Sequence, residues 1–214
     1  MKKIISLILI SMFLLSASVY ANPFNDIEGH WAESEILNAY DAMIVDGDGD
    51  GTFRPDDNIS RAEFVKLLAS VISLNYLEPI PDGLAETDHW ASKYYVFAKS
   101  LVYKPLSAKV GDVTPGILND SDIDAPIERW EMAFMAGEAF KNLFYITDTS
   151  SYADEATVTE NYPTEVAEAI GVCVNVGIIR GDENGYFNPS DNGTRAEATA
   201  IINRMDLKIQ NIMK

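Results

Sequence analysis

A four-residue sequence that begins a predicted helix occurs twice in this chain, and a divergent copy lies between the two. The full copies are Ser60-Arg61-Ala62-Glu63 and Thr194-Arg195-Ala196-Glu197, and the divergent copy is Glu128-Arg129-Trp130-Glu131. The three arginines are separated by 68 and then by 66 residues. Such an even recurrence predicts three structural units that must pack together to bury a shared core.

The arginine of the motif is its least expected residue. Ser or Thr before a helix, with Glu three positions later, forms a capping box that satisfies free N–H groups of the first turn. An arginine at the first helical position has no such explanation, because the helix dipole makes a cation unfavourable there. Since the arginine recurs at this position, the pattern indicates a role outside its own helix.

The repeat extends upstream of the helix in the first and third units. Gly47 and Gly181 lie within glycine-rich turns at residues 44–55 and 178–189, each 14 residues before the arginine. Phe24-Asn25-Asp26 and Tyr152-Ala153-Asp154 share an aromatic-x-Asp pattern. Trp31 and Trp90, each within His-Trp-Ala, open apolar-periodic segments that predict helices. In the second unit, residues 104–123 replace the glycine-rich turn.

This order of residues resembles the S-layer homology domain. The resemblance implies a mainly α fold of three helix-loop-helix repeats, packed as a pseudo-threefold unit with short turns or hairpins between helices. The expected boundaries are 22–78, 84–145 for a divergent second motif, and 150–214. Within them we expect the first helix of the first motif to include Met43, and residues 146–161 to form a linker rich in Ser, Thr and Asp.

The resemblance also implies non-covalent binding of secondary cell-wall polymer or peptidoglycan in grooves between motifs. The matching positions are Asp26, Trp31, Gly47, Arg61, Glu63, Trp90, Arg129, Glu131, Asp154, Gly181, Arg195 and Glu197. An arginine fork suits a carboxylate, for example a ketal-linked pyruvate on a sugar. The glycines would admit backbone donors, the tryptophans would stack on sugars or pack in the core, and the aspartates would hold loops or bind hydroxyl groups.

The copies differ in how much of the motif each keeps. Glu165 stands where the first unit has Trp31, and the second unit lacks the glycine-rich turn. Ranking the sites by motif completeness places the first unit highest. On that basis Arg61→Ala should weaken binding more than Arg195→Ala does, with the fold preserved.

The N-terminal segment and the net charge limit the location and the partners that the protein can have. Residues 1–21 have a basic start, an apolar stretch and a small-residue end, which predicts a secretory signal peptide and a protein of the cell surface, cell wall or S-layer. No later stretch predicts a transmembrane span. The formal net charge of −17 argues against nucleic acid as a partner. Other surface-layer proteins remain possible partners. The lone Cys173 lies in an apolar run and is expected to be buried and inert.

A calcium-dependent adhesion or assembly module is the alternative. Asp46, Asp48, Asp50 and Asp57 have the spacing of an EF-hand-like or dockerin-like loop, although Pro55 falls inside it and Arg180 replaces the first ligand in the third unit. No catalytic motif is present, so we expect neither an enzyme nor a cofactor.

Overall fold

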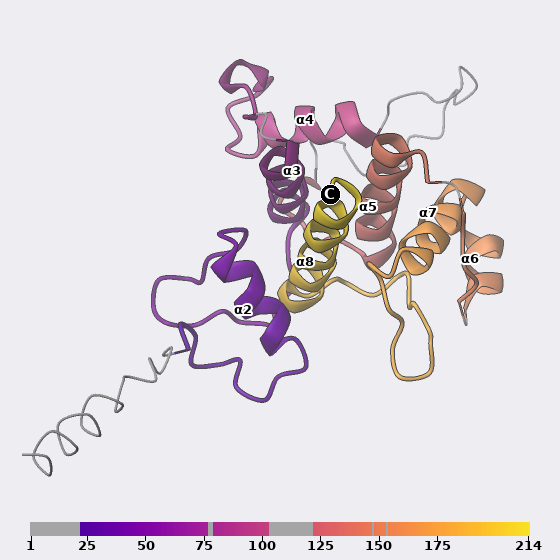
Figure 1. Ribbon diagram of the computed structural model, residues 1–214, viewed down its shortest axis with the longest axis horizontal. Helices are drawn as coiled ribbons and strands as arrows, with labels where there is room; N and C mark the ends of the chain where they lie inside the picture. The colour runs from indigo at the N-terminus through magenta and orange to yellow at the C-terminus, as the bar shows by residue number, and fades with distance from the viewer. Residues whose placement is uncertain (1–21, 77–78, 103–121, 147, 153) are drawn as a thin grey trace, which may run out of the picture.

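The computed structural model describes residues 22–76, 79–102, 122–146, 148–152 and 154–214 (Figure 1). The helices are α2 (Glu33–Asp41), α3 (Arg61–Tyr76), the short 3₁₀ helix η1 (Asp82–Leu84), α4 (Ser92–Val102), α5 (Arg129–Phe144), α6 (Glu155–Asn161), α7 (Thr164–Asn175) and α8 (Arg195–Ile212). Within these residues the chain is mainly α and has no extended strand, as the sequence predicts. The predicted signal peptide and most of the 104–123 segment lie outside the described residues.

The three motif helices start where the capping boxes predict. The Glu63 carboxylate accepts a hydrogen bond from the Ser60 N–H at 2.9 Å, and the Ser60 hydroxyl accepts one from the Glu63 N–H at 3.2 Å. Thr194 and Glu197 form the same reciprocal pair at the start of α8. In the divergent copy, Glu131 accepts from the Glu128 N–H at 2.8 Å. The α3, α5 and α8 helices therefore begin at equivalent arginines for a common physical reason.

Two local expectations are wrong. The α2 helix ends at Asp41, and Met43 lies beyond it with a φ of 59° and a side chain that is 89% exposed. The segment expected to be a linker contains α6, and Val158 from this helix is completely buried. Burial of Val158 therefore helps to order a stretch whose polar composition is typical of a loop.

A ring of backbone hydrogen bonds joins the three motifs at their centre. The Ile59 N–H donates to the Gly193 carbonyl at 3.0 Å, the Gly193 N–H to Ile127 at 2.8 Å, and the Ile127 N–H back to Ile59 at 3.0 Å. These residues stand at the same place in each motif, two positions before the arginine. The isolated bridges Asn58–Thr194, Ser60–Pro126 and Glu128–Asn192 flank this ring. The pseudo-threefold arrangement expected from the repeats is therefore present in the backbone itself.

The first helix of each motif packs against the long helix of another motif. α2 contacts α8, α4 contacts α3, and α7 contacts α5. Figure 1 shows α3, α5 and α8 in the middle of the molecule with α2, α4 and α7 around them. Large apolar side chains such as Phe64, Met132 and Ile202 are fully buried between them. In the second motif α4 also contacts α5, but helices of different motifs pack on one another throughout the core, so the repeats depend on one another.

Cys173 is completely buried, as the sequence predicts. Its surroundings raise the pKa of the thiol, first through burial and then through the negative charge of Glu138. The neutral thiol is therefore strongly favoured and the nucleophilic thiolate disfavoured.

Candidate functional site

The three motif arginines form a ring with the three motif glutamates. Arg61 pairs with Glu131, Arg129 with Glu197, and Arg195 with Glu63. Each pair therefore links the arginine of one motif to the capping glutamate of the next. In two of the pairs, Oε1 of the glutamate faces the arginine while Oε2 caps its own helix. The arginine that helix physics leaves unexplained thus has an intramolecular role, since it joins neighbouring motifs.

The three ion pairs differ in the distances between their charged groups and in how far the glutamates are buried. Arg61 donates from Nε to Oε1 of Glu131 at 2.8 Å and from Nη2 to Oε2 at 2.7 Å, and that glutamate side chain is 4% exposed. Burial alone would lower the pKa of Arg61, but the hydrogen bond and the charge of Glu131 outweigh it and raise the pKa above its ordinary value. The Arg195–Glu63 pair is 3.8 Å apart, beyond hydrogen-bond distance, and the Glu63 side chain is 44% exposed. The ring is therefore tight at Arg61 and open at Arg195.

Two aspartates stabilise the loops that contact Arg129 and Arg195. Asp26 accepts from the N–H groups of Phe53 at 2.9 Å and Arg54 at 2.7 Å. Asp154 accepts from Phe187 at 2.7 Å and from Asn188 at 2.8 Å. Arg54 and Asn188 both have positive φ, 54° and 55°, so the carboxylates stabilise an unfavourable backbone conformation. Both aspartates hold loops, one of the two roles that the sequence left open for them.

The loop carbonyls then orient the arginines. Nε of Arg195 donates to the Phe53 carbonyl at 2.8 Å, and Nε of Arg129 donates to the Phe187 carbonyl at 2.8 Å. The guanidinium carbon of Arg195 lies 4.9 Å from the Phe53 ring centroid, and that of Arg129 lies 5.2 Å from Phe187. These two phenylalanines are not among the site residues predicted from the sequence, although each follows the glycine turn at the same position and so repeats with the arginines.

The motif glycines are required by the loops themselves. A Cβ atom on Gly47 would lie 2.3 Å from Phe24 and 2.7 Å from the Thr52 carbonyl oxygen. A Cβ on Gly181 would lie 2.6 Å from the backbone of Gly185. The glycines therefore allow the chain to double back on itself at these two turns.

The two motif tryptophans lie on the surface, which leaves them available for stacking. Trp31 is 59% exposed and Trp90 is 52% exposed, so neither packs as a core residue. The preceding histidines stabilise the turns before α2 and α4. Nδ1 of His30 accepts from the Ala32 N–H at 3.1 Å, and Nδ1 of His89 accepts from Ala91 at 3.1 Å.

Two grooves bring these residues together, and each combines all three motifs. The Arg129 groove has a volume of about 810 Å³, and the Arg195 groove has a volume of about 220 Å³. The Arg129 groove is lined by Trp31, Ser34, Glu35, Arg129, Met132, Ile179, Arg180, Gly181, Asp182, Glu183, Phe187, Asn188, Asp191, Asn192, Thr194, Glu197, Ala200, Ile201 and Arg204. The Arg195 groove is lined by Ile44, Val45, Asp46, Phe53, Ile59, Glu63, Lys66, Leu67, Trp90, Arg195 and Thr199.

Each groove takes its arginine, its loop and its tryptophan from three different motifs. Arg129 of the second motif faces the loop of the third and Trp31 of the first, whereas Arg195 of the third faces the loop of the first and Trp90 of the second. Arg61 lines neither groove. Among the described residues, the two grooves that contain a glycine-rich loop belong to Arg129 and Arg195, and the ranking of the sites by motif completeness stays a prediction.

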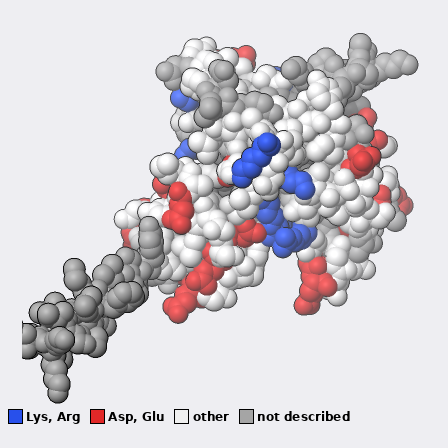
Figure 2. Space-filling model, viewed as in Figure 1, with Lys and Arg blue, Asp and Glu red and all other residues white. Residues whose placement is uncertain are grey.

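Charge on the molecule is unevenly spread. Figure 2 shows Lys and Arg side chains gathered near the middle of one face, while acidic side chains lie around it. Arg204 contributes to the Arg129 groove, where its Nε donates to Glu35 at 2.8 Å. Asp182 on the loop of this groove has a lowered pKa, mainly because it accepts a hydrogen bond from the Tyr186 N–H, so it remains ionised.

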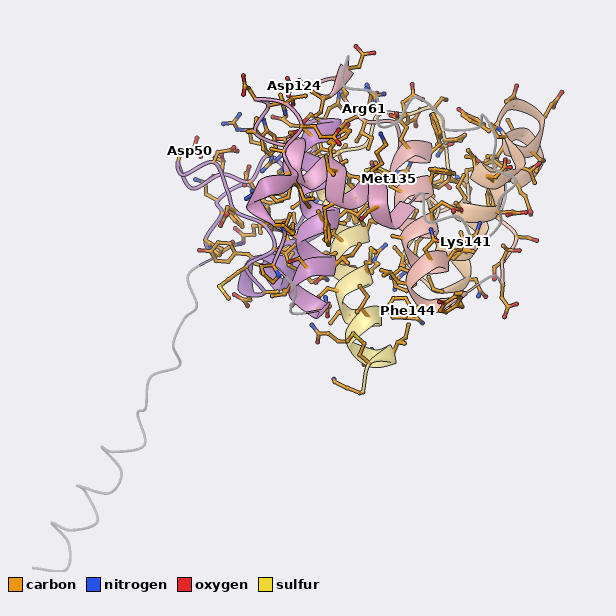
Figure 3. The ribbon with its side chains drawn as sticks, turned by 90° about the horizontal axis from the view of Figure 1, so that it is seen from above. Asp50, Arg61, Asp124, Met135, Lys141 and Phe144 are labelled. Carbon is orange, nitrogen blue, oxygen red and sulfur yellow. The ribbon has the colours of Figure 1, made fainter. Side chains whose placement is uncertain are left out.

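Two of the aspartates of the possible calcium loop have other partners. Asp48 pairs with Arg54 at 3.1 Å, and Asp50 accepts from the hydroxyl and the N–H of Thr52. The Thr52 hydroxyl is the main cause of the lowered pKa of Asp50. Figure 3 places Asp50 at the edge of the molecule and Arg61 nearer its middle. Within the described residues, no group of three His, Cys, Asp or Glu side chains is placed to hold a metal ion.

Comparison with known proteins shows that part of the chain is similar to one protein family. Two segments of the chain match the S-layer homology domain. They are residues 23–65 and 158–199, which fall in the first and third of the expected repeats. The matched segments hold the loops of both grooves and the start of α3 and α8. The middle repeat, expected at 84–145, is outside the matched segments, although its Ile127 takes part in the central ring of backbone hydrogen bonds.

Similar proteins include both enzymes and surface proteins. An amylopullulanase of Thermoanaerobacterium thermosulfurigenes is 30% identical over 201 residues, covering 92% of this chain and 10% of that protein. An uncharacterised cell wall amidase of Bacillus anthracis is 30% identical, covering 86% of this chain and 32% of the relative. An S-layer protein of Bacillus thuringiensis subsp. finitimus is 26% identical, covering 83% of this chain and 20% of the relative. The chain thus spans about a tenth to a third of the length of these proteins.

The described part of the chain also bears on its relation to a membrane. None of its helices combines the length and the apolar character that crossing a bilayer requires.

Proposed function

We propose that this protein is a non-catalytic module that binds a cell-wall glycan, either secondary cell-wall polymer or peptidoglycan, through its two inter-motif grooves. The observation that carries the proposal is the repeated construction of those grooves. Each is lined by an arginine that a loop carbonyl orients and by an exposed tryptophan from another motif. A guanidinium beside an exposed indole suits a sugar that carries an acid group, because the ring stacks while the charge pairs.

The match to the S-layer homology domain supports this proposal, and so do relatives named as S-layer proteins. Enzyme names among the relatives give little support for catalysis, since the chain covers only a small part of each of those proteins. We further propose export by way of residues 1–21 and a location at the cell wall. Other surface-layer proteins are proposed as additional partners.

Co-sedimentation with purified cell walls tests this function. The chain is expected to sediment with walls in the presence and in the absence of a calcium chelator. Failure to sediment under both conditions would exclude wall binding by this chain. The matched control is an acidic protein of similar size, which should remain in the supernatant.

The calcium-dependent alternative predicts a different result in the same experiment. Binding that disappears with chelator and returns with added Ca²⁺ would favour an adhesion or assembly role for the loop at Asp46–Asp57. The pairing of Asp48 with Arg54 gives this alternative no preformed site among the described residues.

A further inference from the structure

A histidine precedes each groove tryptophan and bridges to an aspartate from a later part of the same motif. Nε2 of His30 lies 3.2 Å from Oδ1 of Asp56, and Nε2 of His89 lies 3.2 Å from Oδ1 of Asp124. Nδ1 of each ring accepts a backbone N–H, so the proton of the neutral ring is on Nε2 and is donated to the carboxylate. The two His–Asp bridges therefore have the same geometry in the first and second motifs.

The histidine ring of each bridge also contacts the indole beside it. The ring centroids of His30 and Trp31 are 5.4 Å apart with 39° between the planes, and those of His89 and Trp90 are 5.6 Å apart with 35°. Both indoles are more than half exposed, so contact with solvent alone would leave several rotamers open to them. A histidine that is hydrogen-bonded at both nitrogens limits the orientations that the neighbouring indole can adopt.

Each aspartate of the bridges belongs to a segment that is itself held in place. Asp56 lies between two backbone carbonyls that accept hydrogen bonds from the first two N–H groups of α8, at 2.8 and 2.9 Å. Asp124 lies between two carbonyls that accept from the first two N–H groups of α3, at 3.0 and 2.8 Å. These carbonyls satisfy donors that a helix start leaves free, which fixes the segment to the helix. Each bridge thus ties a tryptophan to the start of a long helix.

That helix lines the same groove as the tryptophan. α8 contributes Glu197 to the groove that Trp31 lines, and α3 contributes Glu63 to the groove that Trp90 lines. The bridge therefore fixes the indole relative to a wall of its own groove. The histidines and aspartates of the bridges line neither groove, so their effect on a ligand passes through the tryptophans.

The third motif lacks the tryptophan, and it lacks the bridge as well. Thr164 stands in place of the histidine, Glu165 in place of the tryptophan, and Ser190 in place of the aspartate. The two carbonyls beside Ser190 nevertheless accept hydrogen bonds from the first two N–H groups of α5, at 3.0 and 2.9 Å. The helix cap therefore forms without the bridge. Within this chain the bridge occurs together with the groove tryptophan, and not with the cap.

The exposure of the bridges limits what they contribute to stability. The side chains of Asp56 and Asp124 are 84% and 73% exposed, and exposed pairs of this kind add little to the free energy of unfolding. Orienting a side chain before a ligand arrives is a different effect, because binding then loses less rotamer entropy. Such an effect appears in affinity rather than in stability.

We propose that the two His–Asp bridges are positioning pairs that hold Trp31 and Trp90 in the orientation in which they stack on a ligand ring. The proposal rests on the proposed function, since it concerns the tryptophans of the glycan-binding grooves. It adds four residues that are not among the site residues predicted from the sequence. Their contribution is to order the indoles in the free protein, before any ligand binds.

NMR relaxation of the indole N–H groups in the free protein tests the proposal without a ligand. Asp56→Ala should lower the order parameter of the Trp31 indole alone, and Asp124→Ala that of the Trp90 indole alone, so each variant is a control for the other. Asp56→Asn keeps an acceptor oxygen for the histidine and should retain the wild-type order. Asp57→Ala is the matched control for the lost charge, because Asp57 is the exposed neighbour of Asp56.

Sedimentation with increasing amounts of purified cell walls then relates indole order to binding. Asp56→Ala should weaken binding to the walls about threefold to tenfold with little change in melting temperature, whereas Asp57→Ala should bind as the wild type does. An unchanged order parameter of Trp31 in Asp56→Ala would overturn the proposal, and so would a lowered order parameter with unchanged wall binding. Failure of the wild-type chain to sediment would instead count against the proposed function, and the order parameters would still decide whether the bridges hold the indoles.

Discussion

At the scale of single residues, equivalent arginines of different motifs differ in their surroundings. Arg61 is closed onto Glu131, whose side chain is 4% exposed, and Arg195 faces a partner that is 44% exposed. Removing one member of a buried ion pair leaves an uncompensated charge, while an exposed pair contributes little. Arg61 is therefore mainly structural, and Arg195 is the better candidate for a ligand contact.

We expect Arg61→Ala to lower the free energy of unfolding by about 3 kcal/mol, because Glu131 loses its two hydrogen bonds from Arg61 while its side chain remains buried. Arg195→Ala should lower it by about 1 kcal/mol, since it loses the bond to the Phe53 carbonyl and a weak ion pair. Urea denaturation of both variants measures the two changes in the free energy of unfolding. The control is Lys99→Ala, at an exposed position on α4. An equal decrease in the free energy of unfolding for the two variants would contradict the idea that the Arg61–Glu131 pair stabilises the fold more than the Arg195–Glu63 pair does.

The residue patterns predicted part of this arrangement. They indicated that the arginines act outside their own helices, and each does contact another motif. They did not identify the partners, because the capping glutamates already had a local explanation. A carboxylate has two oxygens, and in the Glu63 and Glu197 pairs one caps the helix while the other faces the arginine. Sequence spacing cannot reveal such a double role when the partners lie about 70 residues apart.

At the scale of elements, the starts of the motif helices were predictable and packing partners were not. Capping boxes place the starts of α3 and α8 at Arg61 and Arg195. Apolar periodicity shows which face of a helix is buried but not which helix covers it. The packing of α2 on α8 therefore had no signature in the sequence. The assembly of each groove from three motifs follows from that packing and was unpredictable for the same reason.

The loop elements allow a sharp test through their glycines. Gly181→Ala should destabilise the protein by about 1–3 kcal/mol and disturb the Arg129 groove, since the added Cβ would lie 2.6 Å from the Gly185 backbone. Gly83→Ala is the matched control, because nothing lies within 4 Å of the added atom. Thermal melts of the two variants provide the measurement. A melting temperature for Gly181→Ala equal to that of Gly83→Ala would show that the loop relaxes freely.

At the scale of the whole molecule, the three motifs form a closed ring in which the first motif contacts the third directly. The Arg195 N–H donates to the Asp57 carbonyl at 2.8 Å, and the Ile59 N–H donates to Gly193 at 3.0 Å. α2 and α3 both pack against α8, so the N-terminal motif shares its core with the C-terminal helix. A closed ring of this kind ties the stability of each motif to the presence of the other two, in contrast to an open array in which a lost end repeat leaves its neighbours folded.

This closure predicts that the chain unfolds in one cooperative transition and that residues 22–145 do not fold alone. Without residues 150–214, α2 loses α8, α5 loses α7, and two of the three central hydrogen bonds are absent. The apolar faces left exposed, including Ile36 on α2 and Phe140 on α5, favour a collapsed or aggregated state over a native one. Circular dichroism and calorimetry of the shortened chain, beside the full chain, give the measurement. A cooperative melting transition of the 22–145 fragment would show that two motifs suffice for a core and that the ring contributes little.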